Sequence, residues 1–105
     1  MDYKLNAASK KNKGINYNNY YIENPTRVKT LVPINIYKTT DFIPKYVKEE
    51  VPLDTYFDVN DVEFSFDGYP RLKIKKGYCS ANKIFVQQVS EESREESYDG
   101  TRLRK

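Results

Sequence analysis

Hydrophobic and polar residues alternate most clearly between positions 61 and 89. Two short apolar series there occupy every second position and are separated by an Asp-Gly pair: Val62, Phe64 and Phe66, then Leu72 and Ile74. Period-two alternation bounded by turn residues predicts half-buried strands joined by a hairpin. A third run, residues 83–89, completes a predicted three-stranded antiparallel meander.

Burial of the apolar series predicts the register of the first two strands. The expected pairs are Val62–Lys76, Phe64–Ile74 and Phe66–Leu72 toward the core, with Glu63–Lys75 and Ser65–Lys73 on the outer face. A slip by one residue would bury lysines, so it is strongly disfavoured. In this register Arg71 and Lys73 have no acidic partner in the hairpin, and they are available to an anionic ligand.

Residues 27–38 read as a single long strand. Its β-branched positions suit one half-buried face: Val28, Thr30, Val32, Ile34 and Ile36. Pro33 cannot donate a ladder hydrogen bond, which predicts an edge strand or a bulge.

The next segment, residues 39–61, is less regular. Asp41 could cap a short helix that reaches about Glu50, although Val47 and Val51 could also belong to a strand. In either case Pro52 ends the element. Leu53, Phe57 and Val59 then return to strand-like spacing and are expected to be buried.

The predicted fold is a small, mostly antiparallel β domain that covers residues 26–89. It is either a β-barrel or a curled sheet, with one short helix. About five strands are expected, because a lone meander would leave one apolar face exposed to solvent. Residues 1–25 form a polar N-terminal arm that is expected to be flexible when alone. Residues 90–105 form a charged C-terminal tail.

Composition limits the chemistry that the chain can perform. The 105 residues suffice for one domain, and the only cysteine is Cys79. The chain has no His, which removes the commonest general base and most zinc sites. A cluster of Asp and Asn around residues 54–63 lacks the calcium-loop spacing and reads as a solvated turn. We therefore expect no enzymatic activity, no metal and no cofactor.

The remaining composition bears on source and location. No apolar run is long enough for a membrane helix, and residues 1–13 lack the apolar centre of a signal peptide. Abundant Lys, Asn, Ile and Tyr suggest an AT-rich genome, such as that of a phage or mobile element. We expect a protein of the host cytoplasm or of a virion.

Basic and aromatic residues on the outer face of the meander form the best candidate site. The predicted nucleic-acid-binding residues are Arg71, Lys73, Lys75, Tyr69, Tyr78 and Phe85. Lysine and arginine would contact phosphates, and the rings would stack on bases. The alternation does not decide whether Phe85 or Ile84 faces outward, and an ordinary solvated strand face is the competing interpretation.

Part of the chain resembles small OB-type single-strand-binding proteins of phages and accessory proteins of Gram-positive conjugative transposons. The residues that suggest this are Val51-Pro52-Leu53, Phe57, Val62-Glu63-Phe64, Ala81 and Ile84-Phe85-Val86. The resemblance implies a compact β-barrel and single-stranded nucleic acid.

Two functions follow. The first is a non-enzymatic module that binds single-stranded nucleic acid. The alternative is a viral structural or protein-interaction protein, a virion component or host-factor inhibitor, whose N-terminal arm docks onto a protein partner. Homo-oligomer formation stays open in both.

Overall fold

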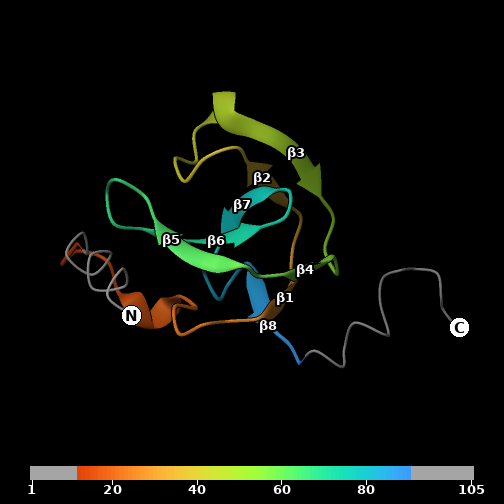
Figure 1. Ribbon diagram of the computed structural model, residues 1–105, viewed down its shortest axis with the longest axis horizontal. Helices are drawn as coiled ribbons and strands as arrows, with labels where there is room; N and C mark the ends of the chain where they lie inside the picture. The colour runs from red at the N-terminus through yellow and green to blue at the C-terminus, as the bar shows by residue number, and fades with distance from the viewer. Residues whose placement is uncertain (1–11, 91–105) are drawn as a thin grey trace, which may run out of the picture.

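A computed structural model of the chain describes residues 12–90, which fold into two antiparallel sheets (Figure 1). The three-stranded sheet has the order β4-β1-β8, with β1 at Arg27–Thr30, β4 at Tyr56–Asp58 and β8 at Val86–Gln88. The five-stranded sheet has the order β3-β2-β7-β6-β5. Its strands are β2 (Ile34–Tyr37), β3 (Val47–Val51), β5 (Asp61–Phe64), β6 (Pro70–Ile74) and β7 (Gly77–Ser80).

The mostly antiparallel β class expected from the alternation is confirmed. The described residues form open sheets rather than a closed barrel, and they divide into eight short strands where about five were expected. Within the same residues, no helix has the length and apolar character needed to cross a membrane.

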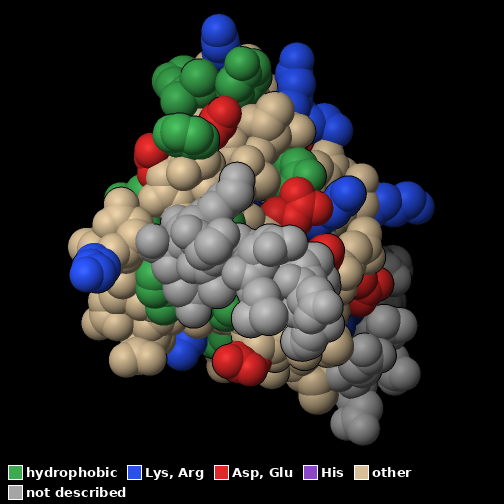
Figure 2. Space-filling model, turned by 60° about the vertical axis from the view of Figure 1, so that its left-hand side comes forward, with side chains coloured by type: hydrophobic (Ala, Val, Ile, Leu, Met, Phe, Trp, Pro, Cys, Tyr) green, Lys and Arg blue, Asp and Glu red, His purple; other side chains and the backbone are tan. Residues whose placement is uncertain are grey.

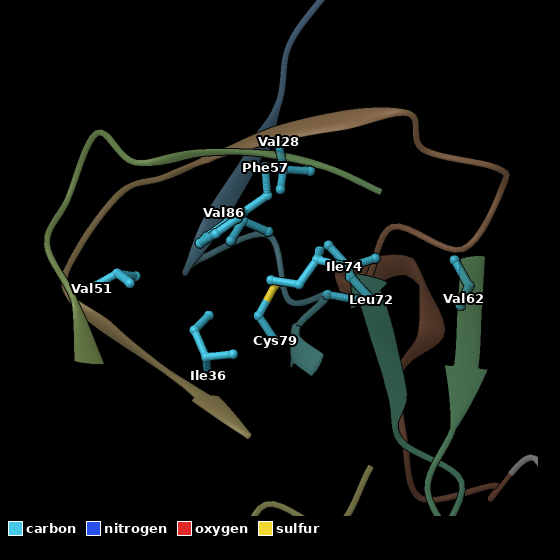
Figure 3. Packing of buried hydrophobic residues seen from close by; sticks show 10 residues of the cluster. Val28, Ile36, Val51, Phe57, Val62, Leu72, Ile74, Cys79 and Val86 are labelled. Carbon is cyan, nitrogen blue, oxygen red and sulfur yellow. The ribbon is translucent and has the colours of Figure 1, made fainter. Parts of the chain in front are cut away.

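Both sheets contribute to one hydrophobic core (Figure 3). Its buried members are Val28, Ile36, Val51, Phe57, Val62, Leu72, Ile74, Cys79, Ala81 and Val86. Burial of each Val, Leu, Ile or Phe side chain among them stabilises the fold by about 1.5–3 kcal/mol relative to exposure. The alternation therefore predicted the inward face of β6 correctly, because Leu72 and Ile74 are both buried.

The predicted register of the first hairpin is wrong by four residues. Val62 pairs with Leu72, and Phe64 pairs with Pro70. An even shift keeps each strand face intact, so the inside and outside of β6 are as expected. Phe66, however, lies in the turn and is 86% exposed.

This turn closes earlier than the sequence suggested. The Ser65 amide donates to the Tyr69 carbonyl, and the Tyr69 amide donates to the Ser65 hydroxyl. Gly68 supplies a φ of 95°, which the other residue types rarely adopt. Ser65 is consequently buried at the turn and does not pair with Lys73.

The third strand of the meander is also not the one predicted. The chain turns at Lys75 and Lys76, and β7 pairs immediately with β6. Gly77, with a φ of 150°, permits this tight return. The 83–89 run instead supplies β8 to the other sheet, where it pairs with β1.

The predicted strand over residues 27–38 is two strands in different sheets. β1 ends at Thr30, and β2 begins at Ile34. Pro33 lies in the crossing between them, where the missing N–H removes no ladder hydrogen bond. Val28, Thr30 and Ile36 are buried as expected, but Val32 lies in the crossing and is exposed.

The segment after β2 resolves the helix-or-strand ambiguity in favour of a strand. A single 3₁₀ turn, η2, spans Pro44–Tyr46, and its N-cap residue is Ile43, not Asp41. β3 follows directly, so the predicted helix to about Glu50 is wrong. Leu53 is exposed because it lies in a turn, where Asp54 has a φ of 64°.

Part of the predicted arm packs against the β domain. A 3₁₀ turn, η1 (Tyr17–Asn19), is capped by the Asn16 side chain. The Tyr17 hydroxyl donates to the Gly68 carbonyl over 2.7 Å, and the Tyr21 amide donates to the Ala81 carbonyl. Residues 12–25 are therefore part of the fold. Residues 1–11 and the tail from 91 onward lie outside the described range.

Candidate functional site: an aromatic pocket on the outer sheet face

A pocket of about 380 Å³ lies against the face of the five-stranded sheet that is turned away from the core. Its walls come from β2, β6 and β7, from the β1–β2, β2–β3, β5–β6 and β7–β8 connections, and from the end of η1. The lining residues are Tyr20, Pro33, Ile34, Asn35, Tyr37, Phe42, Tyr69, Arg71, Ser80, Asn82 and Phe85. This volume falls in the range of small-molecule sites in proteins.

A stack of three side chains forms one wall of the pocket. The Tyr37 and Phe42 rings are nearly parallel, with centroids 4.0 Å apart and an interplanar angle of 10°. The Arg71 guanidinium carbon lies 3.7 Å from the Phe42 centroid. Two groups cannot share one ring face at these distances, so Phe42 is held between Tyr37 and Arg71.

The segment that brings Phe42 into place leaves β2 and returns as β3. Figure 2 shows hydrophobic side chains gathered at the top of the molecule, the end at which β3 begins in Figure 1. The Arg71 Nε donates to the Thr40 carbonyl over 2.9 Å. This hydrogen bond joins β6 to the same segment and fixes the guanidinium plane over the ring.

Burial dominates the electrostatics of Arg71. It lowers the pKa of Arg71 from its ordinary value, while nearby tyrosines and Asp41 act in the opposite direction. Arginine nevertheless stays protonated in proteins. The pocket wall therefore holds a partly desolvated cation, and within residues 12–90 no carboxylate lies within ion-pair distance of it.

The opposite wall depends on the packed part of the N-terminal arm. Tyr20 forms an isolated β-bridge with Asn82, and the Lys83 amide donates to the Asn19 carbonyl. The Asn82 side chain in turn accepts from the Ile84 amide. These bonds shape the 82–85 turn and bring Phe85 to the pocket.

Neither Phe85 nor Ile84 faces the core. Residues 83–85 form a turn, and β8 begins only at Val86. Phe85 is 38% exposed at the pocket, and Ile84 is 66% exposed.

Three of the six predicted site residues meet at the pocket, namely Tyr69, Arg71 and Phe85. Lys73 does have an acidic partner, since its Nζ lies 3.8 Å from Glu63. Glu63 also accepts a 3.0 Å hydrogen bond from the Tyr78 hydroxyl. Burial and this bond raise the pKa of Tyr78 above its ordinary value.

Lys75 lies apart from that group, in the β6–β7 turn, and the predicted Glu63–Lys75 pair does not form. It lines a separate hollow of about 470 Å³ with Lys76 and Arg27. Arg27 is buried there and pairs with Asp58. The six residues therefore do not form one continuous platform.

The sequence missed six of the polar and aromatic pocket residues: Tyr20, Asn35, Tyr37, Phe42, Ser80 and Asn82. Asn35 and Tyr37 carried a usable signal, because they alternate with the buried Ile36 on β2. Phe42 and Tyr20 carried none, since each lies in a segment without periodic alternation.

Cys79 is a core residue. It is fully buried on β7, and burial raises its pKa to about 12, which leaves the thiol protonated at neutral pH. Within residues 12–90, no three His, Cys, Asp or Glu side chains lie close enough together to hold a metal ion.

A relative with a named activity changes the functional interpretation. The chain is 42% identical over 74 residues to a protein of Listeria phage A118 named L-alanyl-D-glutamate peptidase. The similar region is 69% of this chain but only 26% of that protein, so the chain spans about a quarter of its relative's length.

This relative overturns two predictions. Its name points to peptidase chemistry, so the predicted single-stranded nucleic-acid module is wrong. The expectation of no enzymatic activity is contradicted as well, because the relative is named as a peptidase. The viral alternative agrees better with a phage relative, and the expected relation to phages is supported.

The pocket lies within the part of the chain that a known family describes. Residues 20–86 match the family described as a domain of unknown function, DUF5776. This range includes every lining residue of the pocket, from Tyr20 to Phe85. The chain belongs to the DUF5776 family.

Proposed function

We propose that this domain binds peptidoglycan and thereby holds a phage L-alanyl-D-glutamate peptidase on its substrate. The name of the phage relative specifies a bond between L-alanine and D-glutamate, which occurs in the peptides of bacterial cell walls. A domain that corresponds to a quarter of such a peptidase is of the right size for a substrate-binding module.

The aromatic pocket is the observation that carries this proposal. The Tyr20, Tyr37 and Phe85 rings line the pocket with apolar surface, and Asn35 and Asn82 offer amide groups beside them. Apolar faces with a few convergent polar groups are the usual means of binding sugars and short peptides. The site of action would be the cell wall, after synthesis in the host cytoplasm.

Binding to purified peptidoglycan sacculi tests the proposal. We expect the domain to pellet with sacculi, and Phe85→Ala to weaken this binding because Phe85 lines the pocket. Phe66→Ala is the matched control, since Phe66 is exposed but does not line the pocket. An unbound wild-type domain, or equal binding by the two variants, would exclude this function for the pocket.

A further inference from the structure

We infer that Arg71 binds a carboxylate of the wall peptide, so that the pocket recognises an acidic peptide. This inference rests on the proposed function and adds the chemical class of the ligand. In this arrangement the aromatic rings contact the body of the peptide, and the Arg71 guanidinium binds its negative charge.

The first support is the hydrogen bonding of Arg71. Its Nε donates to the Thr40 carbonyl, but the two Nη groups have no hydrogen-bond partner within residues 12–90. Arginine is suited to carboxylates because its planar fork can donate two parallel hydrogen bonds. The site therefore holds unused donors of the type that a carboxylate needs.

The second support is that the guanidinium is already positioned. It lies over the Phe42 ring, and the Tyr69 ring centroid is 5.4 Å from its central carbon. A side chain held in this way loses less conformational entropy when a ligand binds. The cation is also partly desolvated, so an incoming anion interacts with it more strongly than at an open surface.

The contrast with the neighbouring cation on β6 is the third support. Lys73 points to the same sheet face but lies beside Glu63, which offsets its charge. Asp41 is a carboxylate that acts electrostatically on Arg71, but no ion pair joins the two within residues 12–90. Arg71 is thus the cation at the pocket whose charge is left for a ligand.

The ligand class follows from the name of the phage relative. D-Glutamate joined to L-alanine carries carboxylates, whereas the glycan backbone offers mainly hydroxyl and amide groups. A short peptide also suits a pocket of about 380 Å³.

Soluble peptides test the inference without requiring any variant. We would titrate the wild-type domain with N-acetyl-L-alanyl-D-glutamate and with its diamide, which keeps the shape but removes both charges. The acidic peptide should bind roughly tenfold or more tightly, because hydrogen bonds to charged groups contribute about that factor. Equal affinities, or no binding of the acidic peptide, would overturn the inference.

Variants assign the effect to Arg71. Arg71→Gln should remove the preference for the acidic peptide, and Arg71→Lys should retain part of it through the remaining charge. Lys73→Gln is the control on the same strand and should keep the preference. A preference that survives in a folded Arg71→Gln variant would refute the assignment.

The sacculus assay separates this inference from the proposed function. Wild-type binding to sacculi with no preference for the acidic peptide would reject the carboxylate site and leave peptidoglycan binding intact. Failure to bind sacculi would reject the proposed function itself.

Discussion

Replacing Gly77 with alanine should disrupt the pairing of β7 with β2. A Cβ at this position would lie 2.4 Å from the Tyr37 carbonyl oxygen, far inside van der Waals contact. The obstacle is backbone, so it cannot rotate away. Gly77 also has a φ of 150°, a conformation that residues with a side chain rarely adopt.

The two effects can be estimated separately. A residue forced into a sparsely populated backbone region costs about 1–3 kcal/mol. Overpacking at a close contact costs about 1–3 kcal/mol more. We therefore expect Gly77→Ala to lower the free energy of unfolding by about 2–6 kcal/mol. For a domain of this size, that corresponds to a fall in Tm of about 10 °C or more.

Thermal and denaturant unfolding would measure this change. Gly14→Ala is the matched control, because its new Cβ would meet only the end of the Asn12 side chain at 3.3 Å and its φ is not positive. That variant should stay within about 1 kcal/mol of the wild type. A Gly77→Ala protein as stable as the Gly14→Ala protein would contradict the described contact between β7 and β2.

Two further predictions concern the core and the packed part of the arm. Burial raises the pKa of Cys79 to about 12 from an ordinary value of 9.0. The unfolded chain therefore ionises first, and stability should fall between about pH 9 and 12 by up to about 1.4 kcal/mol per pH unit. Unfolding curves of Cys79→Ala should lack this component, and equal pH slopes for the two proteins would contradict it. Tyr17→Phe removes the bond to the Gly68 carbonyl and the bond from the Asn12 amide, and should cost about 1–3 kcal/mol. Hydrogen exchange at the Asn12 amide should then accelerate, and unchanged exchange would show that Tyr17 does not hold the arm.

The sequence predicted strand faces better than strand partners. Alternation placed Leu72 and Ile74 inside and the cations of β6 outside, because burial acts on each strand alone. The hairpin register depended on where the turn closes, and the Ser65 and Gly68 geometry moved it by four residues. Pro33 carried a signal for an interruption, but the alternation continued across it and concealed the change of sheet.

In the candidate site, too, only the residues with a local sequence pattern could be predicted. Arg71, Tyr69 and Phe85 were identified because they lie in or beside the alternating segments. Phe42 reaches Arg71 only because the segment between β2 and β3 folds back over β6, a contact between residues 29 positions apart in the chain. No local pattern encodes such a contact. The proposed ligand class differs from the nucleic acid expected from the sequence for another reason, since exposed lysine and tyrosine are compatible with many partners.

Mapping of the bound surface by NMR would show directly whether the aromatic pocket binds peptidoglycan. The labelled domain would be titrated with soluble peptidoglycan fragments while its amide and arginine Nε signals are followed. We expect shifts at Asn35, Asn82 and the Arg71 Nε, with the β4-β1-β8 sheet unchanged. Shifts confined to β1, β4 and β8, or no shifts at all, would contradict the assignment of the aromatic pocket as the binding site.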